Sequence, residues 1–271
     1  MNKNELQLIS VIVNCYNGEE YLRVAIDSVI AQTHKNWEII FWDNKSTDSS
    51  AKIVKGFCDK RLRYFLAENH TVLYRARNDA IRYCEGKYIA FLDSDDVWEN
   101  TKLEKQLNKF NSDKKLVLVY TKRNWIDCKS NILDRRDNKK LSGNVTSKLL
   151  IKNFIPMSSV MIKSDILSRV GGFNPIYNLL GDYDMWVRIS SAGHVGYINE
   201  KLLNDRLHAN STTNKNLDKW IIEQRSFYMK FLETHKLKYI NIIYYIMRNE
   251  TVNFINNFCR KTKLAKKYIY R

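Results

Sequence analysis

The chain has 271 residues, the size of one large domain or of one domain with a smaller appendage. Hydrophobic residues make up 44% and charged residues 27%, with 2 Pro and 9 Gly, so the composition excludes disordered, collagen-like and linker-dominated chains. The 45 Lys and Arg against 29 Asp and Glu give a net charge of +16, which favours a polyanionic partner such as nucleic acid, an anionic membrane or a phosphorylated substrate.

The sequence gives no signal for export or for a membrane span. The longest apolar runs, such as Ile242–Met247, fall far short of the ~20 residues that cross a bilayer. Met1–Ser10 lacks the charged-then-apolar arrangement of a signal peptide. The five cysteines are scattered without a CxxC pair, which is typical of reduced thiols rather than of disulfides or a zinc site. We therefore expect a cytoplasmic protein.

Two periodicities alternate over the first 120 residues. Short β-branched or aromatic runs predict buried strands at residues 8–13, 37–42, 62–66, 88–92 and 116–121. Between the strands, apolar residues at helical spacing predict four helices. The first follows Gly18, and the second runs to Phe57 after possible N-cap residues in Ser46-Thr47-Asp48. The third lies between Leu73 and Gly86, and the fourth contains Leu107. Strands that alternate with helices predict an α/β fold with a largely parallel sheet.

Polar clusters follow three of these strands, at Asn14–Gly18, Asp43–Asp48 and Asp93–Asp96. In open parallel sheets, ligands bind outside the carboxyl ends of the strands. The three clusters therefore predict a binding site at one edge of the sheet.

Beyond Thr121 the regular alternation of predicted strands and helices ends. Asp127–Asn144 is polar, which predicts a surface loop. A short strand is expected at Ser159–Ile162. A helix from Ser164 is expected to stop at Gly171-Gly172, and a second helix is expected over Asp182–Ala192. We place a domain boundary near Asn214, which divides the chain into a catalytic domain, residues 1–214, and a basic, aromatic-rich helical region, residues 215–271.

The strongest local signal is the acidic trio Asp93, Asp95 and Asp96. Three carboxylates that leave a buried strand repel one another, so they need a cation or a cationic partner. Mg²⁺ or Mn²⁺ suits oxygen ligands, with phosphates and water completing the coordination. The alternative is that Asp96 only caps the helix that follows.

Five segments in this order resemble the family 2 glycosyltransferases of GT-A fold, which are mostly bacterial enzymes of surface-polysaccharide assembly. They are VIVNCYNGEEYLRVAIDSVIAQTHKNWEIIFWDNKSTDSS, RARNDAI, GKYIAFLDSDDVW, GGF…GDYDMWVRIS and RLHANSTT, and they span about residues 7–213. The resemblance implies a Rossmann-like, mostly parallel central sheet flanked by helices, with a C-terminal helical extension.

The resemblance also implies nucleotide contacts at the first two strand ends. Asn14, Tyr16 and Asn17 match the first-strand loop that holds the nucleotide, with Asn14 replacing a more usual Thr. Asp43 and Asn44 match a pair usually written Asp-Asp, which touches the base. An amide oxygen of Asn44 can accept the N3–H of uracil or thymine as a carboxylate does, so pyrimidine recognition is retained while uridine, thymidine and guanosine stay open.

Further matches concern the donor and the metal. Arg77 matches a family Arg near the nucleotide, although a solvated helix Arg is an equal alternative. Asp93, Ser94 and Asp95 match the DxD motif, in which the first carboxylate lies near the ribose and donor sugar and the last binds the metal. His208 matches a family His that can complete the metal shell, against the alternative of a structural His.

Asp182 matches the catalytic Asp of the family's Glu-Asp pair, with Gly181 where the Glu usually stands. Asp184 lies roughly 200° around a helix from Asp182, so the two carboxylates cannot share a face. We assign the base to Asp182, with Asp184 as the second choice; without the resemblance, Asp182 reads as a helix N-cap. Trp186 is expected in the core, with stacking on the acceptor sugar as an alternative.

The function implied is an inverting, metal-dependent transfer of a sugar from a UDP- or dTDP-linked donor to a hydroxyl of a glycan or lipid-linked acceptor in capsule or lipopolysaccharide synthesis. Two alternatives are a nucleotidyltransferase, which would want a Gly-rich phosphate loop, and a basic nucleic-acid binder. Neither is favoured, because Asn14–Gly18 has a single glycine and the acidic residues gather on the expected binding edge, so no nucleic-acid partner is expected.

The C-terminal region, residues 215–271, holds 13 Lys or Arg against 4 Asp or Glu, interspersed with aromatic residues. Basic and aromatic side chains of this kind favour peripheral binding to the inner surface of an anionic membrane. The alternative is that these helices pack on the catalytic domain or on a second subunit.

Overall fold

The computed structural model describes residues 7–135, 141–208 and 217–235. The strands are β1 (Ile9–Cys15), β2 (Trp37–Asp43), β3 (Leu62–Leu66), β4 (Tyr88–Asp93), β5 (Val97–Trp98), β6 (Leu116–Ile126), β7 (Ile132–Leu133), β8 (Met161–Lys163) and β9 (His194–Arg206). The α-helices are α1 (Leu22–Ile30), α2 (Ser50–Lys55), α3 (Leu73–Ile81), α4 (Lys102–Ser112), α5 (Thr146–Ile151), α6 (Ser164–Arg169), α7 (Gly181–Ala192) and α9 (Leu217–His235), and a 3-10 turn, η1, covers Met157–Ser159.

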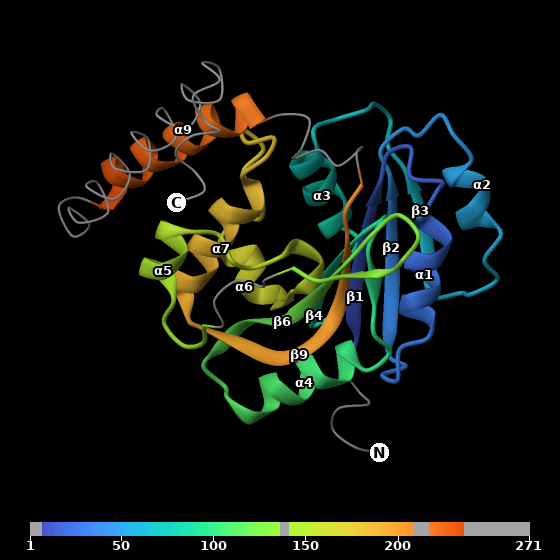
Figure 1. The fold of residues 1–271 in the computed structure, drawn as a ribbon, viewed down its shortest axis with the longest axis horizontal. Coiled ribbons are helices and arrows are strands. Elements are labelled where there is room, and N and C mark those ends of the chain that lie inside the picture. Colours follow the sequence, from blue (N-terminus) through green and yellow to red (C-terminus); the bar gives the residue numbers. More distant parts are fainter. Residues whose placement is uncertain (1–6, 136–140, 209–216, 236–271) are drawn as a thin grey trace.

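The strands form one mixed sheet in the order β3-β2-β1-β4-β8-β6-β9-β5, with β7 paired to β6 (Figure 1). The β3-β2-β1-β4 half is parallel throughout, while β8 runs antiparallel to both β4 and β6. The predicted α/β fold with a mostly parallel central sheet is confirmed.

Helices cover both faces of this sheet because the side chains of each strand alternate between the faces. Ile9, Val11 and Val13 of β1 pack in a core with α1, α2 and α4. Ile12, between them, packs in a second core with helices α3, α5, α6, α7 and α9. The central strands β1, β2 and β4 are therefore buried along almost their whole length and form continuous, mostly apolar runs that are recognisable in the sequence.

The predicted strands before residue 100 are confirmed to within two residues at either end, and β6 runs five residues beyond its predicted end at Thr121. The strand expected at Ser159–Ile162 lies slightly later, as β8, after the turn η1. Helix α2 begins at Ser50 with Ser49 as its N-cap residue, and its backbone N–H at Ser50 is accepted by Asp48 Oδ1 at 3.0 Å. Strand β9, with 13 residues, was not predicted at all.

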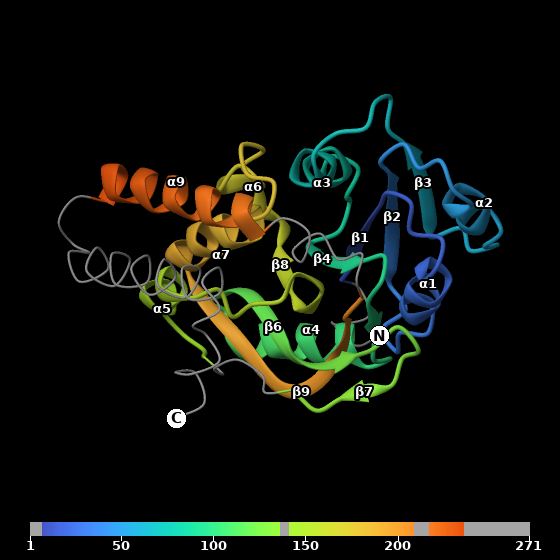
Figure 2. The same cartoon turned by 45° about the horizontal axis from the view of Figure 1, so that its top comes forward.

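Helix α9 lies against α7 in both views (Figures 1 and 2). Its Phe227, Tyr228 and Phe231 are buried in the core shared with α7, where Phe227 lies 4.8 Å from the ring of Tyr183. The described start of the C-terminal region therefore packs on the catalytic domain. The boundary near Asn214 and residues 236–271 lie outside the described residues, and within the described part no helix combines the length and hydropathy of a membrane span.

Candidate active site

A cavity of about 970 Å³ lies at the edge of the sheet where β1 and β4 end. The strand register brings the polar clusters together there, because Asn14 pairs with Asp93 and Cys15 pairs with Asp43. Of the twelve site residues expected from the sequence, ten line this cavity: Asn14, Tyr16, Asn17, Asn44, Arg77, Asp93, Ser94, Asp95, Asp182 and His208. Asp43 and Asp184 are the exceptions.

Asn14 stands at the base of the cavity, with only 9% of its surface exposed. Neither Oδ1 nor Nδ2 of its side chain has a hydrogen-bond partner among the described residues. A buried polar group left unpaired costs about 1–3 kcal/mol, so such groups in native structures usually have a partner. The amide therefore has unused hydrogen-bonding capacity beside the cavity, although neighbouring atoms cover both of its polar atoms in this structure.

The loop after β1 is held close to the neighbouring strand ends. A Cβ on Gly18 would lie 2.8 Å from Cys15 Sγ and 3.0 Å from Ser94 Oγ, so only glycine allows this approach. Asn17 adopts the left-handed conformation, with φ of 53°, and its Oδ1 accepts the backbone N–H of Thr47 at 2.8 Å. The loops after β1 and β2 are thus joined by a hydrogen bond beside the cavity.

The side chains of the pair after β2 both make hydrogen bonds within the protein, and their expected contact with the base stays a prediction. Asp43 is 1% exposed, and its carboxylate accepts the backbone N–H of Ser46 and the hydroxyl of Tyr64, each at 2.7 Å. Asn44 Oδ1 already accepts both the N–H and the hydroxyl of Thr71, and Nδ2 donates to the Thr71 carbonyl. Asp43 thus joins the loop after β2 to Tyr64, and the two Thr71 donors occupy both lone pairs of the Asn44 oxygen.

The end of β4 carries an ion pair into the cavity. Arg77 is buried, so the alternative of a solvated helix Arg is wrong, and its guanidinium donates to Asp93 Oδ1 at 2.5 Å. Burial raises the pKa of the Asp93 carboxyl, while Arg77 opposes that rise. Ser158 Oγ accepts the Asp93 backbone N–H at 3.0 Å and so fixes the strand end from η1.

Asp95 and His208 both line the cavity and are in direct contact, with His208 Nε2 2.7 Å from Asp95 Oδ2. Within the described residues no group of three or more His, Cys, Asp or Glu is arranged to hold a metal. Two facing protein ligands nevertheless fit Mn²⁺ or Mg²⁺, which take carboxylate and phosphate oxygens and keep several waters instead of needing an all-protein cage.

Asp182 lies in the first turn of α7 and enters the same cavity. Its Oδ1 accepts the backbone N–H of Tyr183 at 2.7 Å, and its Oδ2 accepts Asn153 Nδ2 at 3.2 Å. Burial raises the pKa of this carboxyl above its ordinary value, although these hydrogen bonds and the charge of Arg77 oppose the rise. A carboxylate with a raised pKa is a stronger proton acceptor.

Gly181 departs from the family pattern for a reason visible in the packing. A Cβ at this position would lie 2.4 Å from the ring of Tyr74, which comes from α3 and is 4% exposed. The Tyr74 hydroxyl lies 3.3 Å from Asp182 Oδ1 and 3.2 Å from the Leu179 carbonyl. The tyrosine therefore fills the space beside Asp182 that the family's Glu side chain would enter.

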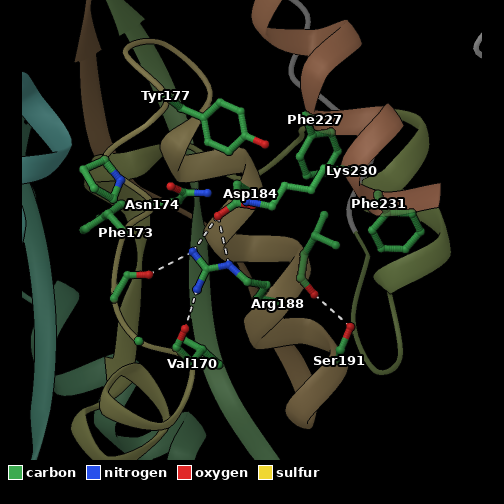
Figure 3. Close-up of a pocket in the computed structure, with 14 residues that line it drawn as sticks. Val170, Phe173, Asn174, Tyr177, Asp184, Arg188, Ser191, Phe227, Lys230 and Phe231 are labelled. Carbon is green, nitrogen blue, oxygen red and sulfur yellow. Dashed lines mark hydrogen bonds and ion pairs between the residues drawn. The ribbon is translucent and has the colours of Figure 1, made fainter. Parts of the chain in front are cut away.

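Asp184 faces a different cavity, of about 620 Å³, between α7, the loop after α6 and α9 (Figure 3). Its carboxylate accepts two bonds from the Arg188 guanidinium, which also donates to the carbonyls of Val170 and Gly172. This arrangement fastens the loop after α6 to α7. The structure thus separates Asp184 from Asp93 and Asp95, while Trp186 is fully buried, as the sequence predicted.

Several residues of the cavity were not anticipated. Asn153 and Ser158 belong to a segment without a motif, and Asp205 lies on the unpredicted β9, where Arg123 of β6 pairs with it at 2.5 Å. Arg206 donates to the Asp95 carbonyl at 2.8 Å and lies 4.3 Å above the ring of Tyr21. Arg206 lies in a motif noted in the sequence, RLHANSTT, whereas Asn153, Ser158 and Asp205 lie in none.

Comparisons with known proteins show the family of this chain. The model of glycosyl transferase family 2 matches residues 10–168. The chain is 32% identical over 270 residues to the uncharacterized glycosyltransferase RP339 of Rickettsia prowazekii, covering 96% of this chain and 82% of that protein. It is 30% identical over 237 residues to the putative teichuronic acid biosynthesis glycosyltransferase TuaG of Bacillus subtilis, covering 86% and 90%.

The fold is similar to that of S. aureus TarS residues 1–349 in complex with UDP-GlcNAc. The TM-score is 0.73 at 16% identity, with 97% of this chain and 76% of that chain covered. TarS supports the GT-A fold alone, since its sequence identity is low. Together, the matched family model and the relatives show that this chain belongs to glycosyltransferase family 2.

Proposed function

We propose that the protein is an inverting glycosyltransferase that moves a sugar from a nucleotide-diphosphate donor to a hydroxyl of a glycan or lipid-linked acceptor. The main support for this proposal is that a single cavity is lined by Asp93, Asp95 and His208 together with Asp182 and Asn14, whose amide is unpaired. These groups comprise a cation site, a proton acceptor and a polar recognition group, which are the parts such a reaction needs.

Asp95 and His208 would hold Mn²⁺ or Mg²⁺. When bound, the cation would neutralise charge on the diphosphate leaving group. Arg77, paired with Asp93, orients the first carboxylate of the motif toward the donor, and Asn14 supplies an amide to the nucleotide at the end of β1. Tyr16 and Ser94 complete this wall of the cavity.

Asp182 is the proposed base. Inversion requires a single in-line displacement, during which a carboxylate accepts the proton of the attacking hydroxyl. Asn153 Nδ2 donates a hydrogen bond to Asp182 Oδ2, which orients the carboxylate. The raised pKa of Asp182 makes it a stronger proton acceptor. Asp184 is engaged with Arg188 in the other cavity and is not proposed for this step.

The donor is proposed to be UDP- or dTDP-linked and the product part of a surface polysaccharide. TuaG is named for teichuronic acid biosynthesis, which supports this class of reaction without specifying the sugar. We place the reaction in the cytoplasm at the inner membrane surface, where a lipid-linked acceptor would be presented.

A panel of nucleotide-sugars tests the proposal by slow hydrolysis of the donor in the presence of Mn²⁺ or Mg²⁺. We expect turnover of a UDP- or dTDP-linked sugar that stops in excess chelator and in Asp95→Asn, with the melting temperature unchanged. Full activity in chelator would contradict the metal role. A preference for free nucleoside triphosphates would favour nucleotidyl transfer, and steeply salt-dependent binding of RNA or DNA would favour the nucleic-acid alternative.

A further inference from the structure

His70 lies in the loop between β3 and α3, at the rim of the active-site cavity beside Tyr16. The two rings are 4.1 Å apart between centroids and tilted by 44°. His70 Nδ1 is 3.0 Å from the backbone carbonyl of Asn44, the residue that matches the family's base-reading position. The imidazole therefore stands where the base end of a nucleotide is expected.

The hydrogen bond at Nδ1 defines the tautomer of this histidine. A carbonyl oxygen can only accept, so Nδ1 must carry the proton that it donates to Asn44. In the neutral imidazole, Nε2 is then an unprotonated acceptor. No hydrogen bond to Nε2 is present among the described residues.

The Asn44 side chain cannot supply that acceptor. Its Oδ1 accepts two bonds from Thr71, at 3.1 and 3.3 Å, which use both lone pairs. One Nδ2 hydrogen donates to the Thr71 carbonyl at 2.7 Å, so only one N–H remains on the amide. This edge of the cavity thus offers one donor on Asn44 and one acceptor on His70.

We propose that His70 Nε2 accepts the imino N3–H of a uracil or thymine base, in place of the side chain of Asn44. The assignment rests on the proposed function, because it deepens the recognition of the donor nucleotide in the same cavity. The remaining Asn44 N–H is available to a base carbonyl next to N3. Cytosine is disfavoured because its N3 is an acceptor and would face the Nε2 lone pair.

Two substitutions distinguish the roles of the two ring nitrogens of His70. In His70→Asn, the amide nitrogen can take over the bond to the Asn44 carbonyl while nothing replaces Nε2. In His70→Gln, the longer amide can place an acceptor near the Nε2 position. Asn69→Ala is the matched control, since Asn69 is exposed in the same loop and does not line the cavity.

The experiment measures dissociation constants of UDP, CDP and GDP by calorimetry in the presence of Mn²⁺. We expect the wild type and Asn69→Ala to bind UDP about tenfold more tightly than CDP, as for one specific hydrogen bond. His70→Asn should weaken UDP binding about tenfold and bring the UDP to CDP ratio near one. His70→Gln should recover part of that ratio.

An unchanged UDP to CDP ratio in His70→Asn would overturn the assignment while leaving the proposed function intact. Wild-type binding of CDP or GDP as tight as that of UDP would also overturn it. If the wild type binds none of these three nucleotides and no dTDP either, with Mn²⁺ or with Mg²⁺, the proposed function fails and the assignment fails with it.

Discussion

Asp182 and Asp184 are two residues apart, but they differ in the cavity that they line and in the groups that bind their carboxylates. Asp182 lines the cavity and is bound by uncharged donors, whereas Asp184 is neutralised by Arg188. We predict that Asp182→Asn lowers turnover by roughly two to four decades while barely changing donor affinity, because only the transition state uses the base. Asp184→Asn is the matched control and should keep the chemistry, with a loss of thermal stability.

Steady-state rates and donor affinity in both variants check this prediction. An active Asp182→Asn beside an inactive Asp184→Asn would reverse the assignment. A product that keeps the anomeric configuration of the donor would refute the single displacement itself.

The surroundings of Asp182 also predict a pH dependence. The base acts as the carboxylate, and burial raises its pKa, so kcat/KM should fall as the pH drops through a value above that of an ordinary Asp. The Tyr74 hydroxyl proton is shared between the Leu179 carbonyl and this carboxylate, and its share toward Asp182 stabilises the charged form. In Tyr74→Phe the pKa of Asp182 should rise further, which moves the acid limb of kcat/KM to higher pH.

A pH profile of donor turnover in the wild type and Tyr74→Phe measures this shift. Tyr83→Phe, at an exposed tyrosine just after the same helix, serves as control. An acid limb that stays in place in Tyr74→Phe would show that the hydroxyl does not act on the base.

Helices α3 and α7 meet where Tyr74 covers Gly181, and the packing makes the two positions interdependent. Gly181→Ala would place a methyl group 2.4 Å from the Tyr74 ring, so we expect it to cost about 1–3 kcal/mol of stability. In a Tyr74→Ala background the same change should cost little, because the space is empty. Urea unfolding of the four proteins measures the coupling, expected at about 0.5–3 kcal/mol; a value near zero would contradict this contact.

The elements differ in how well the sequence predicts them, for physical reasons. β1 and β4 are buried on both faces and so form apolar runs that stand out. β9 changes from buried to exposed and back along 13 residues, and its pairing with β6 shifts register near Lys122, so no single periodicity marks it in the sequence. Asp182 could be found from its motif, whereas Tyr74 and Asn153 act on it from distant segments that only folding brings near.

At the scale of the molecule, helix α9, the described start of the C-terminal region, packs on the core of the preceding residues. Phe227 and Tyr228 are buried in the core, so they are not among the aromatic residues that could contact a membrane. Glu223 of α9 also accepts the backbone N–H groups of residues 178–180, just before Asp182. A chain stopped near Asn214 would lose these contacts, and its failure to bind vesicles would not isolate a membrane anchor.

A stop after His235 separates the two roles, since it keeps α9 and removes residues 236–271, which hold nine Lys or Arg and one Glu. Basic residues contribute about 1 kcal/mol each near an anionic leaflet, and interfacial aromatics add apolar burial. We predict that the full chain sediments with phosphatidylglycerol vesicles at low salt, that high salt releases it, and that the shortened chain stays in solution with near-normal donor hydrolysis. Equal sedimentation of both chains, or none by the full chain, would show that this segment is not the anchor.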